Sequence, residues 1–176
     1  VPHSALGSPT PLASDPPIIA YRSPTNHLAA FTEIEKSAHF KAENMGSPEI
    51  GGSSSGYVHE KKAHLFFRDA NQHVAHLSGA LSSYVAEDLS LIGAANAASD
   101  PKAFTDATGM HRILYRDGSG NLQSLVEEGA SFKPVDLSRA TFFAPASGNP
   151  MGFVSECTSH AVYVDTNHHV RLVETL

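Results

Sequence analysis

The stretch HRILYRDGSGNL, residues 111–122, contains an apolar run, a polar turn and the start of a second run. Related apolar runs begin at His27, His64 and His160. The aromatic residues that close the four runs are 36, 48 and 48 residues apart, at Phe31, Phe67, Tyr115 and Tyr163. An internal period of this size is typical of repeat folds in which each repeat is one small sheet.

Further extended segments surround each run. A short one precedes it, at residues 19–21, 56–58, 103–105 and 152–154. An acidic residue two places after the aromatic opens a polar turn, at Glu33, Asp69, Asp117 and Asp165, and a new alternating run follows. A final segment recurs at 39–45, 84–89 and 132–137, where Pro134 favours an edge position because proline has no N–H to donate. Each repeat is therefore predicted to be a four-stranded antiparallel sheet, with the middle hairpin of the first repeat shortened to 33–37.

The repeats lie near 16–46, 54–90, 101–138 and 150–176. The last repeat lacks a fourth strand, and residues 1–6 resemble residues 132–137 closely enough to supply it. The sequence therefore predicts an all-β single domain over 1–176, a four-bladed β-propeller closed by an N-terminal strand that completes the last blade. Assembly of two chains into a larger ring is the alternative, so we expect a monomer or a homodimer.

Charge and composition exclude several partners. The chain has 12 Lys and Arg residues against 18 Asp and Glu, a net charge of −6, which disfavours nucleic acid. No apolar run is long enough to span a membrane. The one cysteine, Cys157, cannot form an intrachain disulfide, so both a secreted and a cytoplasmic location stay open. Without a second cysteine the chain lacks a typical zinc-binding motif, and we expect no metal and no cofactor.

The repeated polar residues are interpreted as scaffold. Histidines begin all four apolar runs, at His27, His64, His111 and His160, and a feature that repeats in every unit is what a structural requirement produces. The turn acids Glu33, Asp69, Asp117 and Asp165 are expected to accept hydrogen bonds from loop backbone groups. Neither set is predicted to be catalytic.

The motifs Asp88-Leu89, Ser99-Asp100-Pro101, residues 111–117 and Asn121-Leu122 resemble the blade repeat of the fucose-specific-lectin-like β-propellers, a family of fungal and bacterial sugar-binding proteins. The resemblance covers essentially the whole chain and implies carbohydrate binding. In that family, shallow pockets between adjacent blades hold sugars through an arginine, a carboxylate and a stacking Trp or Tyr. This chain has no Trp, and Phe40, Tyr84 and Phe132 stand where the family commonly has one.

By this resemblance, sugar would bind between blades. Arg68 and Arg116 follow the second-strand aromatic in two repeats, whereas Thr32 and Val164 stand there in the other two, so at most two sites are expected. The expected glycan-binding groups are Arg68 or Arg116, a carboxylate of Glu87, Glu127 or Glu128, and the ring of Tyr84 or Phe132.

A second hypothesis places one site at the mouth of a central channel. About two residues beyond the first-strand aromatic, aligned to within one residue, the repeats differ, with Arg22, His59, Asp106 and Ser155. Glu60 and Glu156 come one place later in two of the repeats. His59 oriented by Asp106 would be a general base, and Arg22 would hold a carboxylate or an enolate oxygen. This set predicts a small-molecule binder or a small propeller enzyme of cyclase, isomerase or lyase type. Exposed polar residues that simply vary between repeats are the plain alternative.

Overall fold

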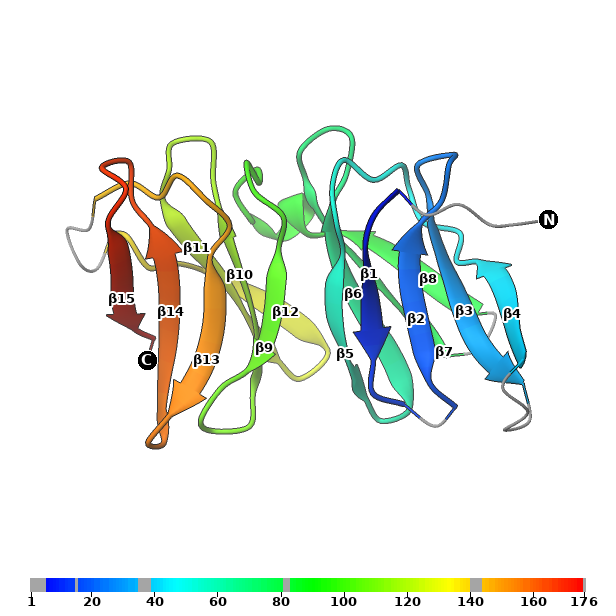
Figure 1. The fold of residues 1–176 in the computed structure, drawn as a ribbon. Coiled ribbons are helices and arrows are strands. Elements are labelled where there is room, and N and C mark those ends of the chain that lie inside the picture. The colour runs from blue at the N-terminus through cyan, green and yellow to red at the C-terminus, as the bar shows by residue number, and fades with distance from the viewer. Residues whose placement is uncertain (1–5, 15, 35–38, 81–82, 140–143, 176) are drawn as a thin grey trace.

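The structure, a computed structural model, describes residues 6–14, 16–34, 39–80, 83–139 and 144–175 (Figure 1). These residues form four antiparallel sheets that stand side by side, and one short 3-10 helix is the single helical element among them. The predicted all-β class is confirmed. No helix in the described part of the chain is long and apolar enough to cross a membrane.

The strands follow one another in chain order within each sheet. The first sheet contains β1 (Leu6–Leu12), β2 (Ile18–Arg22), β3 (Leu28–Ile34) and β4 (His39–Asn44). The second contains β5 (Ser55–His59), β6 (Lys62–Arg68), β7 (Val74–Ala80) and β8 (Ser83–Asp88), after which η1 (Leu89–Ile92) leads onward. The third contains β9 (Lys102–Thr105), β10 (His111–Arg116), β11 (Leu122–Glu128) and β12 (Ser131–Asp136). The fourth contains β13 (Met151–Ser155), β14 (Thr158–Val164) and β15 (Val170–Glu174).

The turn between the second and third strands of each later sheet is held by a carboxylate. Oδ1 of Asp69 accepts hydrogen bonds from the backbone N–H groups of Asn71 and His73, each at 2.8 Å. The corresponding bonds at Asp117 and Asp165 measure 2.8 to 2.9 Å. The expected turn role is confirmed at these three positions. Glu33 instead lies within β3, because the first repeat is aligned differently from the prediction.

The first sheet is shifted by one strand relative to the prediction. Residues 19–21, predicted as its first strand, lie in the second strand β2, and the run that begins at His27 leads into the third strand β3. The innermost strand is β1, which pairs with β2 so that Leu12 lies opposite Ile18. Arg22 pairs with Leu28 in the first sheet as Arg68 pairs with Val74 in the second. Arg22 is therefore a second-strand residue, equivalent to Arg68, and not the first-strand residue that was predicted.

The histidines that begin the apolar runs are not equivalent. His64 and His160 occupy one position, opposite Tyr57 and Phe153. At that position the third sheet has Arg112, opposite Phe104, and His111 lies one residue earlier. His27 belongs to a turn, where its carbonyl accepts a hydrogen bond from Ser23. The interpretation of four equivalent scaffold histidines is therefore wrong.

The predicted closure of the ring is also wrong. Leu6, the last residue of the segment expected to complete the final blade, pairs with Arg22 in the first sheet, and residues 1–5 lie outside the described part of the chain. The first and fourth sheets lie at opposite ends of the molecule in Figure 1. The fourth sheet contains three strands among the described residues.

Apolar side chains pack between successive sheets. Phe66 and Val74 of the second sheet form one cluster with Ile113, Tyr115 and Leu125 of the third. We call the side of a sheet that is turned toward the next sheet in the chain its forward face, and the opposite side its backward face. Because residues two apart in a strand share a face, the strand register assigns every side chain to one of the two.

Candidate functional site

A cavity of about 510 Å3 lies between the second and third sheets. We call it the intersheet cavity. The forward face of the second sheet forms one wall with His64, His76 and Ser78, and the third sheet forms the other with Glu127 and Phe132. Further residues around it are His59, Glu60, Lys62, Glu87, Gly129 and Ala130.

His64 and His76 come together because of the strand register. His76 lies opposite Phe66 on β7, and His64 is two residues before Phe66 on β6, so the two rings share the forward face. Nδ1 of His64 lies 3.1 Å from Nε2 of His76, which is a hydrogen-bond distance. The His76 ring also stacks on Phe66, with ring centroids 4.7 Å apart.

Both imidazoles are neutral at physiological pH. Burial lowers the pKa of His76 to about 4. Burial, together with repulsion from His76, lowers the pKa of His64 to about 4 as well. Nδ1 of His76 lies 3.5 Å from a carboxylate oxygen of Glu87. A proton on that Nδ1 and one on Nδ1 of His64 satisfy both contacts and leave Nε2 of His64 as a hydrogen-bond acceptor.

The opposite wall combines an aromatic ring with a carboxylate. Phe132 is buried and meets His76 edge-on, with ring centroids 5.1 Å apart. Glu127 lies opposite Phe132 in the pairing of β11 with β12. Burial raises the pKa of the Tyr57 hydroxyl, and the charge of Glu127 raises it further. The cavity therefore presents carboxylates, neutral imidazoles and apolar ring surface side by side.

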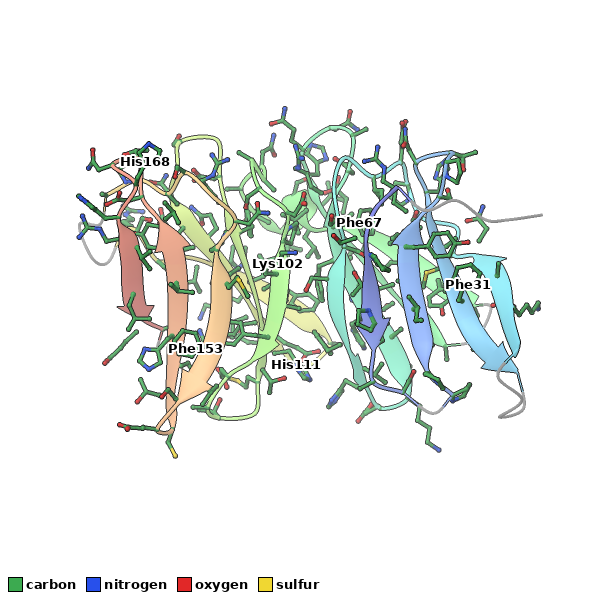
Figure 2. All side chains as sticks on the ribbon, in the orientation of Figure 1. Phe31, Phe67, Lys102, His111, Phe153 and His168 are labelled. Carbon is green, nitrogen blue, oxygen red and sulfur yellow. The ribbon has the colours of Figure 1, made fainter. Side chains whose placement is uncertain are left out.

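His59 and Glu60 are the members of the predicted channel-mouth set that reach the intersheet cavity. His59 meets His111 edge-on, with ring centroids 5.4 Å apart, and His111 is labelled in Figure 2. Glu60 lies in the turn between β5 and β6 with φ +48°, and Glu156 lies in the matching turn of the fourth sheet with φ +49°. Ser155 ends β13 in that same sheet.

Asp106 and Arg22 have other partners. A carboxylate oxygen of Asp106 lies 2.6 Å from Nε of Arg112, and both side chains are almost fully buried. Burial raises the pKa of Asp106, but hydrogen bonds from Thr108 and Arg112 outweigh it and lower the pKa to about 2. Arg22 donates to the side-chain oxygen of Asn26 at 2.7 Å, at the far end of β2. The predicted grouping of His59, Asp106 and Arg22 is therefore not formed.

The predicted sugar-binding set is also divided. Arg68 donates to the carbonyl of Gly51 at 3.1 Å, and Arg116 donates to the carbonyl of Ala98 at 2.8 Å. These carbonyls belong to the loops that connect the sheets, so both arginines have structural partners. Arg68 pairs with Val74 at the start of β7, whereas Tyr84 pairs with Gly79, five residues further along that strand. The Tyr84 side chain packs against the apolar cluster between the first and second sheets. Glu87, Glu127 and Phe132 are the members of this set that border the intersheet cavity.

Sequence reasoning missed the pairing of His64 with His76. The two residues are 12 apart in the sequence. In the other sheets the residues at these two positions have the same separation: Ile18 and Ala30, Arg112 and Ser124, and His160 and Leu172. These pairs differ in every sheet, as the polar residues predicted at the ends of the first strands do. Among the described residues, no group of three or more His, Cys, Asp or Glu side chains is arranged to hold a metal ion.

No protein-family model matches this chain, and no curated protein matches it. Solved structures do match. A structure of the Aleuria aurantia lectin, described as a six-bladed β-propeller with a novel fucose recognition mode, is 10% identical with a TM-score of 0.69, over 99% of this chain and 62% of that one. AofleA from Arthrobotrys oligospora is 13% identical with a TM-score of 0.66, over 99% of this chain and 56% of that one.

A third match is an α-L-arabinofuranosidase from Clostridium thermocellum, 10% identical with a TM-score of 0.53, over 95% of this chain and 67% of that one. The chain spans about 60% of the length of the lectins that it matches. At these identities the likeness concerns the fold. The resemblance to fucose-specific-lectin-like propellers is confirmed at that level: the four sheets of this chain have the fold of fucose-specific lectins.

Proposed function

We propose that this protein binds carbohydrate in the intersheet cavity. The observation that carries the proposal is the wall chemistry: His64, His76 and Ser78 stand where the first sheet has Ile18, Ala30 and Thr32, so this cavity has an imidazole pair where the first sheet has two aliphatic side chains. Its volume, about 510 Å3, is in the usual range for a small-molecule site. Its position between two sheets agrees with the expected interblade sugar site.

The lining has the groups that a sugar requires. Carboxylates of Glu87 and Glu127 accept hydrogen bonds from hydroxyl groups, and Lys62 donates to ring or hydroxyl oxygens. The ring of Phe132 offers apolar surface to the C–H side of a pyranose. Because the cavity has no Trp and its ring is largely covered, we expect millimolar affinity for a monosaccharide and stronger binding to multivalent glycans.

The test is titration with α-methyl-L-fucoside, the ligand in a structure of the Aleuria aurantia lectin, followed by NMR and extended to a glycan array. Glu127→Gln should weaken binding about tenfold, because it replaces a charged acceptor within the cavity. Glu128→Gln is the matched control, since this neighbour is half exposed, pairs with Lys133 and should leave binding unchanged. Absence of binding to any glycan, or equal binding by both variants, would contradict the proposal.

A second candidate is a small-molecule site in another cavity that Glu127 also lines, which we call the inner cavity. A cavity of about 310 Å3 is lined there by His59, Met110 and His111. Because Asp106 is engaged by Arg112, proton transfer at His59 would not use this aspartate. His111→Ala separates the two candidates: it should abolish binding at the inner cavity and preserve glycan binding in the intersheet cavity, of which His111 is not a lining residue.

A further inference from the structure

The forward face of the fourth sheet is apolar and exposed. Strand register places Met151, Phe153, Val162, Val164, Val170 and Leu172 on it. Val170 is 72% exposed, Leu172 57% and Met151 60%. Most of the large exposed apolar side chains among the described residues lie in this sheet. Contiguous apolar patches on a soluble protein commonly mark a surface that is covered by another molecule.

The positions of Val170 and Leu172 are buried in the first three sheets. Leu28, Val74 and Leu122 begin their third strands as Val170 does, and they are at most 1% exposed. The position of Leu172 is held by Ala30, His76 and Ser124, which are at most 6% exposed. In each case the following sheet covers the residue. The fourth sheet thus has the apolar pattern of a covered sheet and no sheet over it within the described chain.

The first sheet carries the complementary half of this interface. Its backward face includes the partly exposed Ile19 and Phe31, and Tyr21, which is buried and stacks on Phe31. The equivalent residues of the second sheet, Leu65, Phe67 and Leu77, are fully buried against the first sheet. In the third and fourth sheets the equivalents are Ile113, Tyr115, Leu125, Ala161, Tyr163 and Val173, none more than 3% exposed. Figure 2 labels Phe31 and Phe153 at opposite ends of the molecule, so the two halves do not meet within one chain.

We propose that the forward face of the fourth sheet binds the backward face of the first sheet in a second copy of this chain. The contact repeats the interface that already joins successive sheets within the chain, which is why a second copy is the occupant that the structure supports. Burial of apolar surface on both sides supplies the driving force. The charged side chain on the fourth sheet's forward face is Glu174, opposite His160, at one margin of the apolar rows. Because the two contacting surfaces differ, the association is head-to-tail.

The experiment measures molar mass by light scattering over a wide range of protein concentration. The wild-type mass should rise above the 18.7 kDa of one chain as concentration increases. Leu172→Glu and Ile19→Glu should each remain monomeric, because each places a charge in one half of the interface. Leu91→Glu is the matched control: Leu91 is 84% exposed in η1, away from both faces, and this variant should associate as the wild type does.

Mixing the two interface variants distinguishes the mode of association. Leu172→Glu retains an intact first sheet and Ile19→Glu retains an intact fourth sheet, so an equimolar mixture should form a dimer that does not grow further. A symmetric contact between two fourth sheets would instead leave Ile19→Glu associated and the mixture without a new dimer, and that result would overturn the proposal. A wild-type chain that is monomeric at every concentration would overturn it too, and would assign the face to a different partner. Circular dichroism melting of each variant confirms that it is folded.

Discussion

The forward faces of the second and fourth sheets share one backbone register and differ in what lies over them. His64 and His76 on the second sheet are enclosed by the third sheet, and they form the wall of a polar cavity. His160 and Leu172 hold the same two positions on the fourth sheet, which no described sheet covers. Cover by a following sheet, rather than backbone geometry, therefore distinguishes the proposed ligand site from the proposed docking surface.

The third sheet completes this comparison. Its residues at the two positions are Arg112 and Ser124, and Arg112 pairs with Asp106 under the fourth sheet. The first sheet thus has two aliphatic residues at these positions, the second has a histidine pair, and the third has a buried arginine and a buried serine. The fourth sheet has a half-buried histidine and an exposed leucine there. The repeat keeps the backbone constant, so each junction between sheets can acquire its own chemistry.

The largest effect is expected from breaking the buried ion pair of the third sheet. Arg112→Ala leaves the buried carboxylate of Asp106 without its cation, and unfolding free energy should fall by about 3–5 kcal/mol. His160→Ala, the same position on the uncovered sheet, should lower it by less than about 1 kcal/mol. Urea denaturation of both variants in dilute protein measures the difference. Equal losses would show that cover does not distinguish these two positions.

A smaller contrast is expected from one residue type at one position. Val74→Ala removes two methyl groups from a fully buried side chain on the second sheet and should destabilise the protein by about 2 kcal/mol. Val170→Ala, at the equivalent position on the fourth sheet, should change stability by no more than about 0.5 kcal/mol in the monomer. Thermal melts at low concentration provide the comparison. A large loss for Val170→Ala in the monomer would mean that a part of the same chain covers this face.

Sequence periodicity predicted the sheets of the second and third repeats because their strands alternate clearly and their turns contain Asp69 and Asp117. It failed for the first repeat because β1 contains Pro9 and Pro11, and prolines disfavour a strand assignment. Loss of that strand shifted the alignment of the whole first repeat by one strand. The predicted alignment therefore places Arg22 with His59 and Asp106, although in the structure it corresponds to Arg68 and Arg116.

The candidate site was predicted less well than the fold because it depends on pairs of residues from different strands. His64 was interpreted as scaffold, since a histidine begins every apolar run, and the register shows that this likeness is superficial for His27 and His111. Glu87 belongs to the predicted sugar-binding set and His59 to the predicted channel-mouth set, yet both border the same cavity. A sequence pattern predicts where the strands lie. Predicting which side chains line a cavity also requires the register between strands and the order of the sheets.

The smallest expected difference between variants concerns the pH dependence of stability, and it again separates the covered histidines from exposed ones. The pKa of His64 and of His76 is about 4 in the folded protein, against an ordinary value of 6.5, so the unfolded chain binds more protons between these pH values. Stability should therefore decrease as the pH falls from about 6.5 to about 4, by about 2 kcal/mol after allowance for partial exposure. His76→Phe should reduce this decrease by about half, because it removes one of the two groups and preserves the stacking on Phe66.

His168→Asn is the control for this prediction. His168 is at an exposed turn position with φ +64°, which asparagine tolerates, so this variant should keep the full decrease. Urea denaturation at a series of pH values measures all three proteins, and equal stability of the wild type at pH 6.5 and pH 4.5 would show that the two imidazoles are not held neutral by burial.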